Sequence, residues 1–332
     1  MNSGPLKGIL DAVGGTPLVE LPALAAGAGF RLFAKLERFN PGGSIKDRTA
    51  LSMVRELVER GDLVPGRSTV VESSSGNLAV GLAQICRYYG LRFVCVVDVR
   101  TTEQNLAILR ALGAEVERVT EPDPDSGEYL PVRLRRSREL VESIPGAYWP
   151  NQYANPLNPR AHRATMAEIA ADLDGRVDVL VAAASTFGTL RGCAEYARDA
   201  GLDTMIVGVD AVGSVIFGPA PEDAAPRLIP GHGASVRPPL AEPDLVDRVV
   251  HVTDLECVVQ CRRLVGREAI LAGGSSGAVL AAVERLRGVI PEGANCAVVL
   301  PDGGDRYLDT IYSDAWVRRH FGEVSHLWKE RT

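Results

Sequence analysis

Residues 40–48 are Asn-Pro-Gly-Gly-Ser-Ile-Lys-Asp-Arg, a glycine-rich turn that ends in the start of a helix. A β-rich run at 31–37 precedes the turn and an amphipathic segment at 47–61 follows it, as expected in an open α/β sheet. Lys46 lies where free backbone N–H groups and the helix dipole disfavour the ammonium form of a lysine. A neutral lysine can form a Schiff base with an aldehyde. Taken alone, the stretch fits an exposed lysine at an ordinary helix start equally well.

The alternation of short β-rich runs and amphipathic helical segments continues along the chain. It predicts an α/β fold with open, mostly parallel twisted sheets. The expected strands are 31–37, 69–74, 92–98, 177–183, 204–210 and 296–302. The expected helices are 47–61, 77–90, 102–113, 163–173, 189–201, 254–269 and 277–286. Two Pro-rich stretches, 121–131 and 219–239, are expected to be exposed loops, either beside a site or as plain connectors.

Composition argues against several functional classes. A chain of 332 residues is long enough for one large domain or two lobes. Its net charge of −6 argues against a nucleic-acid surface, which needs a basic face. We find neither an apolar run of membrane-spanning length nor a signal-peptide pattern. The six cysteines, scattered mostly in apolar stretches, predict buried free thiols in a reducing, cytoplasmic setting, and we expect no metal site.

Two further turns join an expected strand to an expected helix, and a third opens the helix expected at 277–286. Residues 72–77, Glu-Ser-Ser-Ser-Gly-Asn, offer N–H groups suited to a carboxylate, and the asparagine could donate to a phenolic oxygen. Residues 185–189, Ser-Thr-Phe-Gly-Thr, suit a phosphate. Residues 273–277, Gly-Gly-Ser-Ser-Gly, could place a serine hydroxyl against a pyridine nitrogen, which would favour α,β-elimination over transamination. Each turn alone also fits an ordinary helix start, but together they would converge at one crevice.

Five motifs occur together in a specific order: PGGSIKDR (41–48), SSSGN (73–77), SxxGT (185–189), AGGSSGA (272–278) and PDGGDRYL (301–308). By these motifs the chain resembles, nearly end to end, the cysteine synthase branch of the fold-type II pyridoxal-phosphate (PLP) enzymes. The resemblance implies a fold like the tryptophan synthase β-subunit and a homodimer. It also implies a small mobile lobe at 42–145 and a large PLP-binding lobe formed by 1–41 and 146–332.

The resemblance assigns roles to individual residues. Lys46 would hold PLP covalently and act as general base and acid. The other cofactor-binding residues would be Asn77, Ser185, Thr186, Gly188, Thr189 and Ser275. The carboxylate of the amino-acid donor would be held by Ser74, Ser75, Gly76 and Gln152.

One subgroup of this branch is similar at further positions: YWPNQYAN (148–155), GVDAVGSVIFG (208–218), GHGAS (231–235) and YLDTIYSDAW (307–316). Its members serve 2,3-diaminopropionate biosynthesis for siderophores and peptide antibiotics. The resemblance therefore implies O-phospho-L-serine as donor, L-glutamate as amine nucleophile and phosphate as leaving group.

Three departures from ordinary cysteine synthases put sulfide in doubt as the second substrate: Leu78, the start of the phosphate loop at 185–186, and the segment 121–136. A second substrate with two carboxylates needs positive charge, so Arg133 is a candidate to bind it. A solvent-facing helix arginine is the more ordinary interpretation. Tyr153 is a candidate pocket wall or donor, or simply a packed aromatic residue. A cysteine synthase, a serine or threonine dehydratase and a catalytically silent PLP-fold binding protein remain alternatives.

Overall fold

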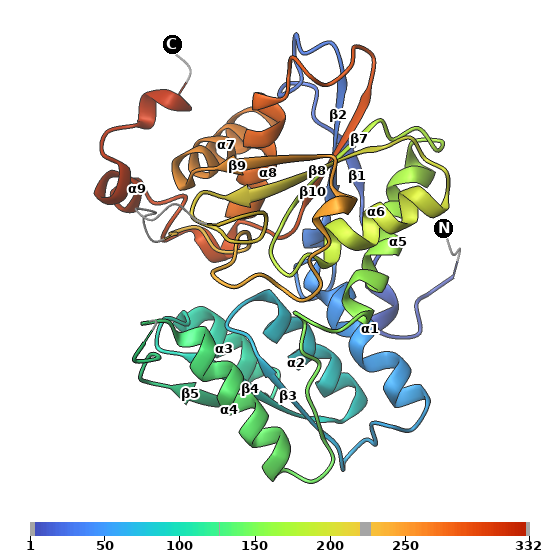
Figure 1. Cartoon of the computed structure of the whole chain (residues 1–332), viewed down its shortest axis with the longest axis vertical. Helices are drawn as coiled ribbons and strands as arrows, with labels where there is room; N and C mark the ends of the chain where they lie inside the picture. Colours follow the sequence, from blue (N-terminus) through green and yellow to red (C-terminus); the bar gives the residue numbers. More distant parts are fainter. Residues whose placement is uncertain (1–3, 126, 220–226, 330–332) are drawn as a thin grey trace. The chain divides into compact units, whose positions relative to one another are not determined.

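The computed structural model describes residues 4–125, 127–219 and 227–329, which fold into two compact units (Figure 1). The first unit takes in the chain up to Val13 and Asn40–Asn158, and the second takes in Gly14–Phe39 and the chain from Pro159 onward. The resemblance implies a small lobe at 42–145 and a large lobe formed by 1–41 and 146–332. The first unit extends beyond the small lobe at both of its ends. Leu10 packs in the core of the first unit, and residues 147–148 form a strand of its sheet, so both ends belong to that unit.

A four-stranded parallel sheet forms the centre of the first unit, in the order β5-β4-β3-β6. The strands are β3 (Thr69–Ser73), β4 (Arg92–Asp98), β5 (Glu115–Val119) and β6 (Ala147–Tyr148). The helices are α1 (Lys46–Glu59), α2 (Asn77–Tyr89), α3 (Glu103–Ala111) and α4 (Tyr129–Ser143).

Both faces of this sheet are buried, because successive side chains of a strand point to opposite faces. Val70, Cys95 and Val97 pack with α1, α2 and α3 on one face. Val71, Val94 and Val96 pack with apolar side chains of α4 on the other. The continuous apolar run in β4 and the full burial of β3 are therefore typical of a parallel sheet that is covered on both sides.

A six-stranded sheet forms the centre of the second unit, in the order β1-β2-β10-β7-β8-β9. Only the pairing of β1 with β2 is antiparallel among the strand pairs of the described residues. The strands are β1 (Leu18–Glu20), β2 (Arg31–Leu36), β7 (Val179–Ala183), β8 (Met205–Ala211), β9 (Arg248–Val252) and β10 (Asn295–Leu300). The helices are α5 (Leu157–Asp172), α6 (Gly188–Asp199), α7 (Asp254–Glu268), α8 (Gly274–Arg285) and α9 (Asp314–Phe321).

Five short 3-10 helices complete the described elements: Ile9–Ala12, Glu37–Phe39, Pro243–Leu245, Asp305–Tyr307 and Ser325–Leu327. The α/β fold with mostly parallel sheets is confirmed, and every expected strand and helix is present with its ends shifted by a few residues. The structure adds the strands β1, β5, β6 and β9 and the helices α4 and α9. Helix α4 begins at Tyr129, inside the stretch expected to be an exposed loop.

The predicted state of the cysteines is confirmed, since all six are buried free thiols. Over the described ranges, no group of three or more His, Cys, Asp or Glu side chains is placed to hold a metal ion. A helix with the length and apolar character needed to span a membrane is also absent from the part of the chain that the structure describes.

Candidate active site

Three of the turns singled out in the sequence lead into helices whose N-cap residue has no side-chain acceptor. These N-caps are Gly76 for α2, Phe187 for α6 and Gly273 for α8. By contrast, α3, α7 and α9 are capped by the hydroxyl groups of Thr102, Thr253 and Ser313. A helix start without a side-chain acceptor leaves backbone N–H groups for an anionic ligand. The starts of α1 and α4 also lack a side-chain cap, so this feature is compatible with anion binding at the three turns but is shared with other helices.

The turn before α1 fixes the position of Lys46, the first residue of that helix. The N–H of Gly42 donates to the Asp47 carboxylate at 2.5 Å, and the N–H of Lys46 donates to Ser44 Oγ at 3.2 Å. A Cβ on Gly42 would lie 2.5 Å from the same carboxylate, so a larger residue there would displace the Asp47 side chain. Lys46 itself is half-buried. The turn therefore holds the lysine backbone in one conformation at the helix start.

The loop after β3 is anchored through its carbonyl oxygens. Cys95 Sγ donates to the carbonyl of Ser74 at 3.1 Å, and Asn105 Nδ2 donates to the carbonyl of Ser75 at 2.9 Å. A Cβ on Gly76 would meet no heavy atom of the described residues within 4 Å, so this side of the loop is open. The first unit thus places Ser74, Ser75, Gly76 and Asn77 together beside open space.

Glu72 connects this loop to the segment that contains Gln152. Its side chain is fully buried at the end of β3. One carboxylate oxygen accepts from Ser73 N at 2.8 Å and from Trp149 Nε1 at 3.0 Å, and the other accepts from Gln152 N at 3.3 Å. Burial raises the pKa of Glu72 to about 7, against the opposing effect of these hydrogen bonds. The sequence showed Glu72 within a motif, but nothing local indicated this contact.

Arg133 lies on α4 and is not solvent-facing, which corrects the more ordinary interpretation of its sequence. Its side chain is 13% exposed, and its Nε lies 3.3 Å from Asp98 Oδ2 at the end of β4. Among the described residues its Nη1 finds no hydrogen-bond partner. Burial raises the pKa of the half-buried Tyr153, while the charge of Arg133 lowers it and that of Glu72 raises it. Arg133, Tyr153 and Glu72 therefore belong to one cluster.

In the second unit, the turn at 185–189 leads directly into α6. Thr186 is buried, and its hydroxyl accepts from Gly188 N at 3.4 Å. Phe187 has a left-handed φ of 71° and packs against the ring of Phe217. Within the described chain, the first turn of α6 contains no acidic residue. Hydroxyl and N–H donors without a nearby carboxylate fit a phosphate group.

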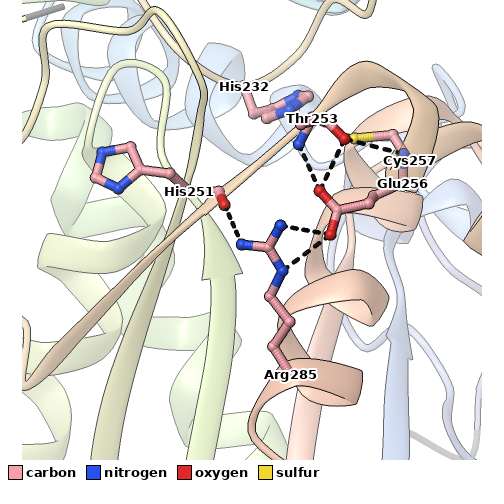
Figure 2. Close-up of polar contacts among 6 residues, drawn as sticks. All are labelled: His232, His251, Thr253, Glu256, Cys257 and Arg285. Carbon is pink, nitrogen blue, oxygen red and sulfur yellow. Dashed lines mark hydrogen bonds and ion pairs between the residues drawn. The ribbon is translucent and has the colours of Figure 1, made fainter. Parts of the chain in front are cut away.

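Ser275 is buried in the first turn of α8 and faces a glycine. A Cβ on Gly231 would lie 3.2 Å from Ser275 Oγ, and Gly231 has a φ of 97° that favours glycine. The next residue, His232, is buried, and its Nε2 lies 3.7 Å from Cys257 Sγ on α7 (Figure 2). Burial lowers the pKa of His232 to about 4, so the ring is neutral near pH 7. The neutral ring of His232 adds no positive charge on this side of Ser275, which suits a hydroxyl that faces an unprotonated pyridine nitrogen.

A short network at the C-terminal end of α8 holds α7, α8 and β9 together (Figure 2). Thr253 and Glu256 form a reciprocal cap at the start of α7. Arg285 of α8 donates to Glu256 Oε1 at 2.5 Å and to the carbonyl of His251 at 2.5 Å. These contacts fix α8 relative to the strand beside it.

The family model described as "Pyridoxal-phosphate dependent enzyme" matches residues 9–302 of this chain. The chain belongs to this family. The cofactor of the family is PLP, and the donors at 185–189 and at Ser275 fit its phosphate and its ring nitrogen. In the first unit of this PLP-dependent enzyme, Lys46 is the first residue of α1 and Asn77 is the first residue of α2.

Two curated relatives of this PLP-dependent enzyme are named N-(2-amino-2-carboxyethyl)-L-glutamate synthase. The one from Ralstonia nicotianae is 48% identical over 314 residues, which cover 94% of this chain and 91% of the relative. The one from Cupriavidus metallidurans is 47% identical over 315 residues, with the same coverage.

Solved structures of the same fold are also similar. O-ureido-L-serine synthase matches with a TM-score of 0.85 at 32% identity, over 97% of this chain and 98% of that one. Cysteine synthase from Entamoeba histolytica matches with a TM-score of 0.85 at 30% identity, over 94% of this chain and 92% of that one. The fold-type II architecture expected from the sequence is therefore confirmed.

Proposed function

We propose that this chain joins O-phospho-L-serine and L-glutamate to give N-(2-amino-2-carboxyethyl)-L-glutamate and phosphate. The Cβ–O bond of the donor breaks, a bond forms between Cβ and the glutamate nitrogen, and that nitrogen loses a proton. The observation that carries the proposal is near-half identity, over 94% of the chain, to two relatives named for this product. The product would supply 2,3-diaminopropionate biosynthesis.

When bound, PLP withdraws electrons from the α-carbon of an amino acid, which allows a leaving group on the β-carbon to depart. The ε-amine of Lys46 would hold the cofactor and then move a proton from and to the α-carbon of the substrate. The remaining cofactor contacts would come from Asn77, Ser185, Thr186, Gly188, Thr189 and Ser275. The uncapped start of α6 and the neutral His232 next to Gly231, which faces Ser275, support these assignments.

The carboxylate of the donor would be bound by Ser74, Ser75, Gly76 and Gln152, beside the open space at Gly76. Arg133 would bind a carboxylate of glutamate, and Tyr153 would line the same pocket. The support for Arg133 is its burial together with an Nη1 that lacks a hydrogen-bond partner among the described residues. A guanidinium that is already desolvated loses little further hydration when it binds a carboxylate.

We further propose that the enzyme acts in the cytoplasm as a homodimer on small amino acids, without a metal, a membrane or a nucleic acid. The lobe at 42–145 would be the mobile one and would exclude water from the reacting groups. Six buried free thiols support a reducing compartment.

Mass spectrometry of the products tests this function. The purified holoenzyme is mixed with O-phospho-L-serine and, in separate reactions, with glutamate, other amines, sulfide or no acceptor. The glutamate adduct and one equivalent of phosphate are expected, and Lys46→Ala should form neither. Cysteine from sulfide with no glutamate adduct would make the chain a cysteine synthase. Pyruvate without any adduct would make it a dehydratase.

A separate measurement tests the covalent role of Lys46. Borohydride reduction of the holoenzyme followed by peptide mapping should place the pyridoxyl group on Lys46. A cofactor-loaded protein without this label would contradict the assignment, whichever products are found.

A further inference from the structure

The carboxylate of Glu72 binds two segments that carry predicted substrate-binding residues. On one side it accepts from Ser73 N, the first residue of the 73–77 loop. On the other side it accepts from the Trp149 indole, from Gln152 N and from the backbone of Asn151. The two segments are more than 70 residues apart in sequence and meet at this one side chain.

We infer that Glu72 is a positioning residue that holds the 73–77 loop and Gln152 in one arrangement, ready for the carboxylate of the amino-acid donor. The inference rests on the proposed function only for the identity of that donor. Glu72 is not a catalytic residue in this inference, because it acts through the backbone of its neighbours.

The burial of Glu72 explains why a carboxylate is needed at this position. At full burial, water cannot replace a lost partner, so each N–H that points at Glu72 depends on it. A carboxylate offers acceptors only, with room for several donors, which no neutral side chain of this size provides.

Glu72 lies close to other titratable groups. Burial raises the pKa of Cys95, of Tyr148 and of Tyr153, and the charge of Glu72 raises each of them further, while Arg133 acts in the opposite direction on Cys95 and Tyr153. Burial raises the pKa of Glu72 itself to about 7. Protonation places a hydrogen on one carboxylate oxygen of Glu72, and that oxygen then presents a donor to the N–H groups around it. The contact to Trp149 or to Gln152 should therefore weaken as the pH falls through 7.

The test uses Glu72→Gln, which keeps the size of the side chain but replaces one acceptor oxygen by an NH2 donor. Glu115→Gln is the matched control, because Glu115 is an exposed carboxylate of the same unit that pairs with Arg92. Both variants are also made with Trp316→Phe and Trp328→Phe, so that Trp149 is the one remaining tryptophan of the three in the chain.

In Glu72→Gln, the KM for O-phospho-L-serine should rise at least tenfold, while kcat and cofactor loading change less than threefold. Trp149 fluorescence of the substrate-free protein should titrate near pH 7 when Glu72 is present, and this titration should disappear in Glu72→Gln. Glu115→Gln should match the parent protein in all these measurements. A KM for the donor within twofold of the parent value, or a Trp149 titration that persists, would overturn the inference.

Trp149→Phe provides a second route if Glu72→Gln does not fold, since it removes one donor and leaves the carboxylate in place. It should raise the KM for the donor about threefold, and an unchanged KM would overturn the inference. Failure of the proposed function is distinguishable, because it would appear as a missing glutamate adduct. The Trp149 titration needs no substrate and would be unaffected by that failure.

Discussion

The backbone carbonyl of Cys257 on α7 occupies the space in which a side chain on Gly277 of α8 would begin. A Cβ on Gly277 would lie 2.1 Å from that oxygen and 2.7 Å from Cys261 Sγ. Helices α7 and α8 therefore pack at a distance that only glycine allows. Because Ser275 lies in the same turn of α8, this close packing also sets the position of the hydroxyl proposed to face the cofactor ring.

Gly277→Ala is expected to lower the free energy of unfolding by about 2 kcal/mol, since the overpacked helix must shift. The affinity for PLP should fall at the same time, because Ser275 moves with the helix start. Urea unfolding and cofactor titration measure the two effects. Gly288→Ala is the control, as a Cβ there would meet no heavy atom of the described residues within 4 Å, and it should leave both values unchanged. Equal stability of the two variants would show that the helices repack freely.

Arg133→Lys is expected to raise the KM for glutamate about tenfold, equivalent to about 1.4 kcal/mol, because lysine cannot form two parallel hydrogen bonds to a carboxylate. Steady-state kinetics with each substrate varied in turn provide the measurement. Arg136→Lys, one turn further along the same helix and already paired with Glu117 and Glu139, should behave as the parent enzyme. A rise in the KM for O-phospho-L-serine alone would mean that Arg133 binds the donor instead of glutamate.

The cysteines are expected to be unreactive in the native protein. Burial raises the pKa of Cys95, of Cys261 and of Cys296 to about 12 in each case, and the thiolate is the reactive form. At pH 8, Ellman's reagent should label none of the six thiols within minutes, and all six in denaturant. Rapid labelling of even one thiol in the folded protein would contradict the structure around it.

His232 is expected to reduce stability in acid. Its folded-state pKa is lowered to about 4 from 6.5, so the unfolded chain binds a proton that the folded chain does not. The contribution of the neutral His232 to the free energy of unfolding is therefore full above pH 6.5 and is lost as the pH falls from 6.5 to 4. The loss amounts to about 3 kcal/mol, at about 1.4 kcal/mol per pH unit.

Denaturant unfolding at pH 7 and at pH 4.5 provides the test. The free energy of unfolding lost between pH 7 and pH 4.5 should be smaller by about 2 kcal/mol in His232→Gln than in the parent protein. In the exposed control His326→Gln this loss should equal that of the parent protein. The variants must be compared with one another, because Glu72 changes the stability in the opposite direction to His232 as the pH falls. Its raised pKa makes the folded chain take up a proton as the pH falls through 7, which favours folding. An identical pH dependence in His232→Gln and the parent would contradict a buried neutral histidine.

Some elements of the fold could be predicted and others could not, for local reasons. Helix α2 has an apolar periodicity along its length, strand β3 is a short run with β-branched residues, and a Ser-Gly turn marks the boundary between them. Strand β6 has only two residues, too few to show any period. Strand β9 is a short strand at the edge of its sheet, and three of its five side chains are exposed, so its pattern resembles a loop. The start of α4 was hidden by the Pro- and Asp-rich residues before it.

Local chemistry fixed the order of strands and helices, the turns that lead into them, Lys46 at the start of α1, and the family to which these motifs belong. Contacts between distant segments came only with the folded chain. Glu72 and Trp149 are 77 residues apart, and Asp98 and Arg133 are 35 residues apart, and neither pair shares a helix or a strand. Their meeting depends on the register of β3 with its neighbours and on the packing of α4 across the sheet. No periodicity within one segment encodes such a contact, because it is specified by many residues that act together over the whole unit.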